Sequence, residues 1–468
     1  MMKIKDSKDK SFNMVVDDNM LKNTGESNTT DLSKRVTTAA LTEAKFGSKV
    51  VVAGYIKRIR TVSANLAFVL LADQYGEVQL TCKSDSLKNI KDIQKFTRHS
   101  FIVAEGTLVK GQAKVGMEIE ATKLELLTDK PAQPLPIELE KVNTGLETRL
   151  NYRWIDLRDT KHRIPIIMLS KITAEFRNFL TKEAFIEIFS PKFTGYPTEG
   201  GSEVFSVDYF GRKAYLAQSP QFYKQMAICS GLEKVFEIAP VFRANPSFTS
   251  RHDTEFTSFD LEMAYITSHH DVMTLEERML NHAIKGLLRT SSAEIAQVTN
   301  NPLNEPGKIP RVKMEEAYQI VSKNNITPEG DLNPDGEREL AKYIKNETGN
   351  DFVFVTDYPW AARPFYHMLG EPMSDGTKTT KSFDLIFRGV EITTGAQREH
   401  NYDKLVENAK AKGLNTENLQ YYLDFFKYGA PPHGGFGFGL TRIVTQMLDL
   451  ENVRESTLVP RDPKRLRP

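Results

Sequence analysis

The sequence has few cysteines, almost no net charge and no apolar run long enough to cross a membrane. Cys82 and Cys229 lie far apart and neither has the spacing of a metal ligand, which argues against a disulfide scaffold and favours a reducing, cytoplasmic setting. The 62 basic and 61 acidic residues leave a net charge of +1, so we expect no general coating for nucleic-acid binding. The N-terminus lacks the apolar stretch of a signal peptide.

The composition changes along the 468 residues, a length that suits two or three domains. Residues 1–32 are polar, and we expect them to be disordered or loosely ordered because they bury too little surface to offset their ordering entropy. The prolines between Pro131 and Pro136 predict a stiff linker. We therefore place a small domain at 33–129, a linker at 130–150 and a large domain at 151–468.

The small domain contains short apolar segments with the character of strands. They are residues 49–56, 67–71, 78–81 and 101–106, and the Asp73-Gln74-Tyr75-Gly76 segment is a tight turn between two of them. Several short strands in one small domain predict a β-barrel, and the OB-fold is the obvious candidate.

The large domain alternates helices and strands. Ile172, Phe176 and Phe179 recur at helical spacing within 166–184, and a strand at 185–191 follows, ending at Pro191. Residues 270–350 have mostly helical patterns with Pro/Asn-rich loops between them. We expect an α+β domain built around an antiparallel sheet.

Two segments of the large domain combine arginine with elements suited to a nucleotide. The first runs from Phe242 to Phe256 and includes Arg243, Arg251 and His252; the second is Gly435-Phe-Gly-Phe-Gly-Leu-Thr-Arg442. Arginine grips phosphate oxygens with a planar fork, an aromatic ring stacks on a base, and alternating glycines let backbone approach a ligand closely. Two such segments predict an enzyme that handles a triphosphate, whereas either alone could be ordinary surface arginines.

These segments resemble motifs 2 and 3 of the class II aminoacyl-tRNA synthetases, and the helix and strand that lead to Pro191 resemble motif 1. The resemblance implies an antiparallel sheet flanked by helices and a homodimer formed through motif 1. It implies that Arg243 and Arg442 are catalytic, holding the α- and γ-phosphates of a bent ATP. The implied ATP-binding residues are Arg243, Asn245, Arg251, His252, Asp253, Phe256, Glu391, Gly439, Leu440, Thr441 and Arg442. Asn245 and Thr441 depart from the family pattern, because relatives usually have Glu at both positions.

Asp384 and Glu391 are the expected ligands of Mg²⁺. They are seven residues apart, so a continuous strand would place them on opposite faces, and a turn at Arg388-Gly389 would have to re-aim the second. Carboxylate oxygens beside a triphosphate suit Mg²⁺, and the resemblance favours the metal over an ion pair with a nearby arginine.

The segment Gln218-Ser-Pro-Gln-Phe-Tyr-Lys-Gln225 is similar to the amino-acid pocket of aspartyl enzymes of the archaeal and eukaryotic type. Aspartate needs cationic donors for its side chain, and the resemblance implies that Lys224 and Arg398 supply them. By the same resemblance Gln221 and Glu199 bind the substrate ammonium, and Thr394 supplies a hydroxyl where a Ser is usual. Lys224 alone would be read as a solvated helix lysine.

In the barrel, Arg60, Phe68 and Gln79 match positions that contact anticodon bases in the aspartyl family, through stacking or hydrogen bonds to base edges. The alternative for Phe68 is burial in the barrel core. The resemblance as a whole implies a cytoplasmic ligase that joins L-aspartate to tRNA(Asp), with ATP as substrate, and it leaves open whether tRNA(Asn) is charged as well. The competing hypotheses are an asparaginyl enzyme and a non-catalytic, RNA-binding paralogue. The extension at 1–32 is read as a passive tail rather than a tRNA-binding arm.

Overall fold

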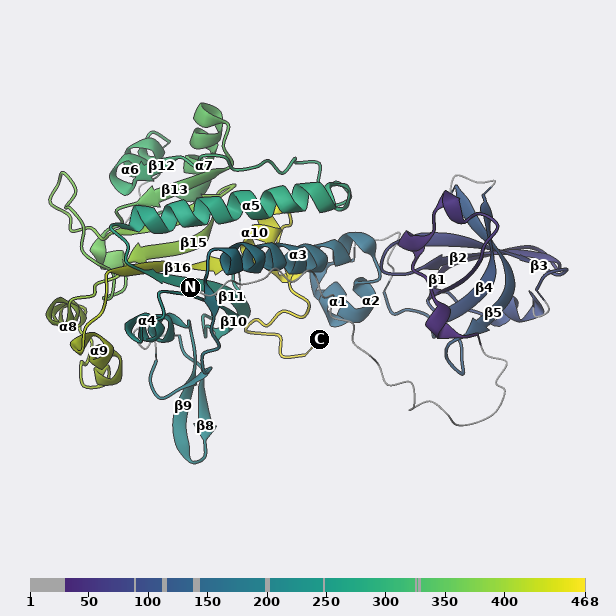
Figure 1. The fold of residues 1–468 in the computed structure, drawn as a ribbon, viewed down its shortest axis with the longest axis horizontal. Coiled ribbons are helices and arrows are strands. Elements are labelled where there is room, and N and C mark those ends of the chain that lie inside the picture. The colour runs from purple at the N-terminus through teal and green to yellow at the C-terminus, as the bar shows by residue number, and fades with distance from the viewer. Residues whose placement is uncertain are drawn as a thin grey trace, which may run out of the picture. The chain divides into compact units, whose positions relative to one another are not determined.

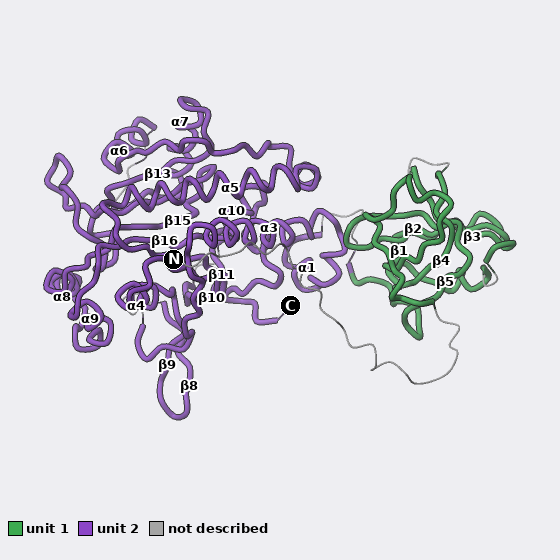
Figure 2. Tube along the Cα trace, in the orientation of Figure 1, with its two compact units in different colours: residues 1–136 green, residues 137–468 purple. Residues whose placement is uncertain are grey.

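The computed structural model describes residues 30–87, 90–111, 116–137, 144–197, 203–246, 249–324, 326 and 330–467. The chain divides into two compact units, residues 1–136 and 137–468 (Figure 2). Most of the predicted N-terminal extension, residues 1–29, lies outside the described residues. Among the helices of the described ranges, none has the length and apolar character needed to span a membrane.

Unit 1 contains a closed barrel with the strand order β1-β2-β3-β5-β4. Its strands are β1 (Lys49–Ser63), β2 (Leu66–Ala72), β3 (Glu77–Lys83), β4 (Phe101–Lys110) and β5 (Met117–Leu126), and its 3₁₀ turns are η1 (Leu32–Lys34), η2 (Thr38–Ala40), η3 (Glu43–Lys45) and η4 (Ile90–Lys95). Alternate residues such as Val69, Leu71 and Leu80 fill the interior. The predicted turn forms, with the Asp73 N–H donating to Gly76 O over 3.0 Å.

Unit 2 is built on an eight-stranded sheet in the order β12-β13-β14-β15-β16-β11-β10-β6. Its inner strands pair antiparallel, as predicted, and only the outer pairs β12–β13 and β10–β6 are parallel. The strands are β6 (Ile186–Glu187), β10 (Lys234–Phe242), β11 (Glu255–Ala264), β12 (Arg311–Lys313), β13 (Phe352–Thr356), β14 (Ser382–Phe387), β15 (Val390–Gln397) and β16 (His433–Gly439). A separate three-stranded sheet consists of β7 (Phe193–Thr194), β9 (Arg212–Leu216) and β8 (Ser206–Tyr209).

Two long helices, α3 (Thr160–Lys182) and α5 (His269–Ile295), pack side by side against one face of this sheet (Figure 1). The core between them includes Phe176, which stacks on Phe259 of β11 with ring centroids 5.2 Å apart. Helix α3 begins earlier than the sequence pattern predicts, because the Asp159 carboxylate accepts a hydrogen bond from the Lys161 N–H and caps the helix there. Helix α5 begins with a capping box formed by Ser268 and Asp271.

The remaining helices are shorter than α3 and α5. They are α1 (Leu146–Asn151), α2 (Arg153–Asp156), α4 (Gln221–Cys229), α6 (Met314–Ser322), α7 (Pro334–Thr348), α8 (Tyr402–Ala411), α9 (Gln420–Lys427) and α10 (Leu440–Met447), with 3₁₀ turns η5 (Trp360–Ala362) and η6 (Val453–Ser456). Helices α6 and α7 form a smaller core with β12, β13 and β14. The largest part of the core lies between the sheet and the helices α3 and α5, and the candidate site lies on the opposite face of the sheet.

Candidate active site

A cavity of about 450 Å³ lies against the middle strands of the unit 2 sheet. Strand β11 shows why it is polar: Phe259 and Leu261 point into the core with α3 and α5, while Phe256, Ser258 and Asp260 alternate with them and line the cavity. The cavity therefore occupies the sheet face opposite the two long helices. Its volume falls in the range of small-molecule sites.

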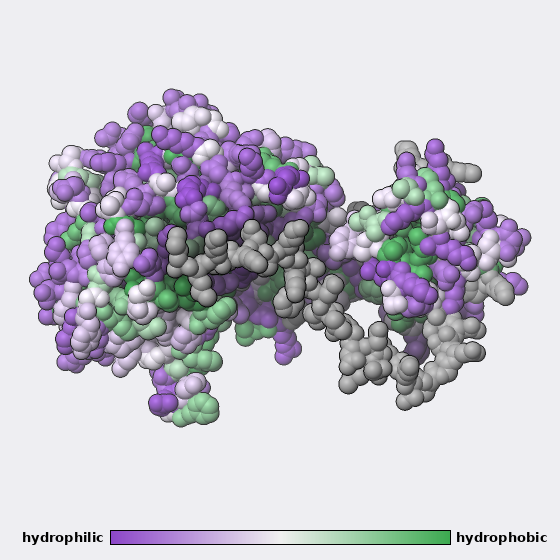
Figure 3. Space-filling model, viewed as in Figure 1, coloured by the Kyte–Doolittle hydropathy of each residue, from purple (hydrophilic) through white to green (hydrophobic). Residues whose placement is uncertain are grey.

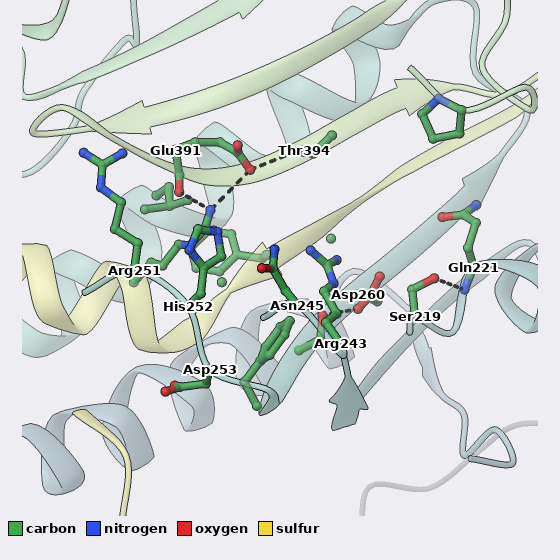
Figure 4. Close-up of a pocket in the computed structure, with 18 of the residues that line it drawn as sticks. Ser219, Gln221, Arg243, Asn245, Arg251, His252, Asp253, Asp260, Glu391 and Thr394 are labelled. Carbon is green, nitrogen blue, oxygen red and sulfur yellow. Dashed lines mark hydrogen bonds and ion pairs between the residues drawn. The ribbon is translucent and has the colours of Figure 1, made fainter. Parts of the chain in front are cut away.

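Arginines line the cavity from the end opposite Gln221, where Arg251 lies, to its middle, where Arg243 lies (Figure 4). Arg243 directly follows β10, and its guanidinium carbon lies 5.4 Å from the centroid of the Phe256 ring. Arg251 pairs with Glu337 at 3.0 Å, and Arg442, in the first turn of α10, donates to Glu391 O at 2.9 Å. Burial and the nearby arginines lower the pKa of His252, so this ring is neutral at pH 7. The arrangement forms a clamp for an anion with several oxygens.

Most of the site residues predicted from the sequence come together in this cavity. Those that line it are Gln221, Arg243, Asn245, Arg251, His252, Asp253, Phe256, Glu391, Thr394, Arg398, Gly439, Thr441 and Arg442. Leu440 instead packs in the hydrophobic core, which leaves only its backbone for a contact with ATP. Glu199 lies outside the described residues.

The other end of the cavity is a network of buried charges. Lys224 is completely buried on α4 and does not line the cavity; its Nζ lies 3.0 Å from Asp260 Oδ1 and 3.6 Å from Glu262 Oε2. Arg398 donates to Glu262 Oε1 at 2.9 Å and to Gln221 Oε1 at 3.1 Å. Burial alone would raise the pKa of Glu262, but Arg398 and Lys224 outweigh it and the pKa lies below its ordinary value. Lys224 is thus a buried cation and not the solvated lysine of the simpler interpretation.

Asp384 and Glu391 reach the same sheet face through the turn between β14 and β15, because Glu391 pairs with Ile386, two residues after Asp384. Leu385 pairs with Thr393 but Ile386 pairs with Glu391, so Ile392 is an extra residue that shifts the alternation of β15. Arg388 and Gly389 form the predicted turn with φ of 48° and 79°. This turn alone resolves the seven-residue spacing that would otherwise separate the two carboxylates, and the bulge at Ile392 places Thr394 opposite Asp384 on the same face.

The environment of these carboxylates fits a cation. Arg363 Nη2 donates to Asp384 Oδ2 at 2.6 Å, while Asp384 Oδ1 is buried without a hydrogen-bond partner among the described residues. Burial raises the pKa of Asp384 to about 7, against the pull of Arg363 and with Glu391 adding to the rise. An ion pair with an arginine, the alternative considered above, is therefore present, but it uses only one of the two carboxylate oxygens.

On the barrel, the three predicted anticodon residues lie on adjacent strands. Arg60 of β1 pairs directly with Phe68 of β2, and Phe68 pairs with Thr81, two residues from Gln79 on β3. Phe68 is only partly buried and alternates with Ala67 and Val69, which point inward. The core alternative for Phe68 is wrong, since its side chain is on the outer face of the barrel.

Comparison with known proteins accounts for both units. Residues 145–463 match the family described as tRNA synthetases class II (D, K and N), and residues 50–127 match the OB-fold nucleic acid binding domain. The chain belongs to the class II tRNA synthetases. It is 42% identical to the aspartate–tRNA(Asp/Asn) ligase of Aeropyrum pernix, over 91% of this chain and 97% of that protein. It is also 42% identical to the aspartate–tRNA(Asp) ligase of Pyrococcus abyssi, over 92% and 98% of the two chains.

Solved structures of this family superpose closely on the chain. Asparaginyl-tRNA synthetase from Pyrococcus horikoshii in complex with asparaginyl-adenylate gives a TM-score of 0.86 at 31% identity and covers 93% of this chain and 99% of its own. Aspartyl-tRNA synthetase from Entamoeba histolytica gives 0.82 at 29% identity, covering 93% of each chain. The predicted fold, a class II sheet with an OB-fold barrel, is confirmed.

The structure shows the surroundings of Asn245 and Thr441, the two residues that depart from the motifs of the class II synthetases. Asn245 lines the cavity, and the preceding Ala244 N–H donates to Glu203 O at 2.8 Å. Thr441 precedes an Arg442 that is held by the carbonyl and carboxylate of Glu391, at 2.9 and 3.4 Å. Arg442 is therefore oriented by a partner on β15 and does not need an acidic neighbour in its own motif.

The sequence analysis missed several cavity residues of this class II site. Asp260 could have been found, because it lies on β11 at an even spacing from Phe256. Arg363, Tyr366 and His367 come from an irregular segment after η5, and no periodic pattern marks them. His367 Nε2 lies 3.0 Å from Arg398 Nη1; since arginine only donates, this nitrogen accepts and the ring proton sits on Nδ1.

Proposed function

We propose that this chain is an aspartate–tRNA ligase that activates L-aspartate with ATP and transfers it to the 3′ end of tRNA(Asp). The observation that carries the proposal is a single cavity that joins an arginine clamp to Arg398, with the buried cation Lys224 behind the lining residue Asp260. The clamp suits a triphosphate, and the buried cations suit an acidic side chain. The names of the most similar relatives support the same substrate.

The residues divide the first reaction between them. In the proposed complex, Lys224 and Arg398 face the side-chain carboxylate of aspartate, while Gln221 and Glu199 bind its ammonium and Thr394 adds a hydroxyl. Arg243 stabilises charge at the α-phosphate as the aspartate α-carboxylate attacks phosphorus, and Arg251, His252 and Arg442 hold the outer phosphates. Fixed donors aimed at developing charge are the usual source of such rate enhancement.

We also propose that Asp384 and Glu391 hold Mg²⁺. Support comes from their shared sheet face and from the buried Asp384 Oδ1, which lacks a hydrogen-bond partner among the described residues. When bound, the ion would neutralise charge on the phosphates. Arg363 keeps its bond to the other oxygen of Asp384 and holds that carboxylate in place.

The asparaginyl alternative draws on the structural neighbour with asparaginyl-adenylate. The buried Lys224 argues for aspartate, because a neutral amide needs no second buried cation beside Arg398. ATP–pyrophosphate exchange with each amino acid decides the question. Exchange that depends on aspartate supports the proposal; exchange that depends on asparagine overturns it, and no exchange with either favours the non-catalytic paralogue.

We propose tRNA as the second substrate, read on the barrel face that carries Arg60, Phe68 and Gln79. Charging purified tRNA(Asp) and tRNA(Asn) transcripts side by side tests the range of the enzyme. One relative is named for tRNA(Asp) and another for tRNA(Asp/Asn), so both outcomes occur in the family. Such an enzyme would act in the cytoplasm, where translation takes place.

We further propose a homodimer formed around Pro191. Exposed apolar side chains gather there, on the edge strand β6, on β7 and at the β8–β9 hairpin: Ile186, Phe189, Phe193, Tyr209 and Phe210. Figure 3 shows apolar residues over this hairpin on the lower side of unit 2. A group of large exposed apolar side chains of this kind supports an interaction site.

Replacing Phe189, whose exposed fraction is 83%, with Asp should yield monomers in light scattering, because it places a charge in the interface. Replacing the equally exposed Tyr428 with Asp is the control and should leave the dimer intact. A dimer that persists in the Phe189 variant would contradict this interface.

A further inference from the structure

A second cavity, of about 240 Å³, adjoins the arginine end of the active site. The two cavities share Arg251 and Arg442 as lining residues, and the second adds Arg338 and Arg388. We call this second cavity the arginine annex. Among its described lining residues only Glu451 is acidic, and the carboxylates that pair with the four arginines lie outside the lining: Asp335, Glu337, Asp351, Glu391 and Asp449. Such an imbalance among the lining residues favours an anionic ligand.

The wall of the annex is set by close backbone packing. Arg338 lies on α7 against Gly389, in the turn between β14 and β15. A Cβ at Gly389 would lie 3.0 Å from both Cα and Cγ of Arg338, and the φ of Gly389 is +79°. This position therefore needs glycine for space and for conformation, and the close approach holds Arg338 at the rim.

Arg388 has one N–H group, at Nε, that donates no hydrogen bond to the described residues. Its side chain is only 9% exposed, and its two terminal nitrogens donate to Gln446 O at 3.2 Å and Pro302 O at 2.6 Å. Its Nε is buried and has no hydrogen-bond partner among the described residues. Leaving a donor of a charged group unpaired is costly, and a phosphate oxygen would satisfy it.

Arg338 is available to a ligand as well. It pairs with Asp335 at the surface, where the two side chains are 56% and 72% exposed. A surface ion pair of this kind is weak and exchanges readily for another anion. The annex thus combines the two arginines that it shares with the active site, the accessible guanidinium of Arg338 and the unpaired Nε of Arg388.

The reaction itself supplies an anion at this place. In the proposed adenylation an aspartate carboxylate oxygen forms a bond to the α-phosphorus, and the bond from that phosphorus to the bridging oxygen breaks. The electron pair leaves with pyrophosphate, on the side opposite the attacking oxygen. The attacking group sits near Gln221, and Figure 4 shows Gln221 and Arg251 at opposite ends of the cavity. Pyrophosphate therefore departs towards the end where the annex opens.

We infer that the arginine annex is a pyrophosphate site that receives the product as it leaves the phosphate clamp. The inference rests on the proposed function for the identity of the anion. Its test measures binding of pyrophosphate to the full-length chain in the absence of ATP and aspartate, by calorimetry, together with product inhibition of aspartate activation. The variants are Arg338→Gln and, as a matched control one turn along α7, Lys342→Gln, whose side chain is 70% exposed and does not line the annex.

Arg338→Gln should raise the dissociation constant and the inhibition constant of pyrophosphate about five- to tenfold, the effect of losing one charged contact to a phosphate. The KM for ATP should stay within about twofold, because the clamp is unchanged, and Lys342→Gln should behave as the native protein. Unchanged pyrophosphate binding in Arg338→Gln, or equal weakening in both variants, would overturn the annex. Absence of aspartate-dependent exchange in the native protein, with pyrophosphate binding still sensitive to Arg338, would instead contradict the proposed function.

Discussion

At the scale of single residues, the buried cations at the Gln221 end of the cavity are already paired within the protein. Lys224 is held by Asp260 and Arg398 by Glu262. The carboxylate of a bound substrate would therefore join a network in which each cation already has an acidic partner. Its binding depends on whether the positive charges around the cavity outnumber the negative ones. Arg243, which also lines the cavity, shifts that balance towards the positive.

Replacing Lys224 with Met should abolish most aspartate activation and also destabilise the fold. The change leaves Asp260 buried beside Glu262 without its cation, a loss of about 3–5 kcal/mol when one partner of a buried pair is removed. We expect the aspartate concentration for half-maximal ATP–pyrophosphate exchange to rise at least about a hundredfold. ATP binding, measured separately, should be little changed.

A double variant separates the two effects. Adding Asp260→Asn to Lys224→Met removes the unpaired charge, so the free energy of unfolding should recover. Aspartate activation should not recover, since the cation is still missing. Recovery of both stability and aspartate affinity would show that Lys224 serves only to hold Asp260.

At the scale of elements, sequence alone predicts the parts of this fold that repeat a simple pattern. The apolar alternation of β2 and the helical spacing within α3 are visible in the letters. Strand β5 shows the same alternation, with Glu118 and Glu120 between its inward residues, although it was not among the predicted strands. The sheet face on which Thr394 lies depends on a one-residue bulge at Ile392, which no local pattern predicts.

Helix α5 contributes a buried acid beneath the sheet that predicts a pH dependence. Glu276 accepts a hydrogen bond from Thr393 Oγ1 at 2.6 Å, and burial raises its pKa from the ordinary 4.5 to about 8. Between these values the unfolded chain loses the proton first, so this residue lowers the free energy of unfolding as pH rises from about 4.5 to about 8. Below that window it carries no such penalty.

Replacing Glu276 with Gln, the neutral counterpart of the protonated acid, should remove this dependence. Relative to the native protein, the variant should gain about 3–5 kcal/mol of unfolding free energy between pH 5 and pH 8.5. Denaturant unfolding at both pH values measures the gain, and the exposed Glu316→Gln on α6 is the control. A difference that does not change with pH would mean that Glu276 is not protonated in the folded protein.

At the scale of the whole molecule, the chain consists of two compact units, residues 1–136 and 137–468. The cavity residues all belong to unit 2, and the proposed anticodon face belongs to unit 1. Adenylation uses ATP and aspartate alone, so it should need only unit 2. Transfer to tRNA should need both.

Phe68→Ala tests this division. Its ring lies on the outer face of the barrel between Arg60 and Thr81, so its loss removes a stacking surface worth about 1–3 kcal/mol per base without emptying the core. Aminoacylation of tRNA(Asp) should weaken about ten- to a hundredfold in kcat/KM. Aspartate-dependent ATP–pyrophosphate exchange should stay native, and so should the melting temperature of the barrel.

Val69→Ala is the contrasting change, because Val69 is fully buried and its loss should lower the melting temperature through a cavity. Native aminoacylation by Phe68→Ala would place the anticodon elsewhere on unit 1, whereas an equal loss of exchange would show that the two units do not act separately.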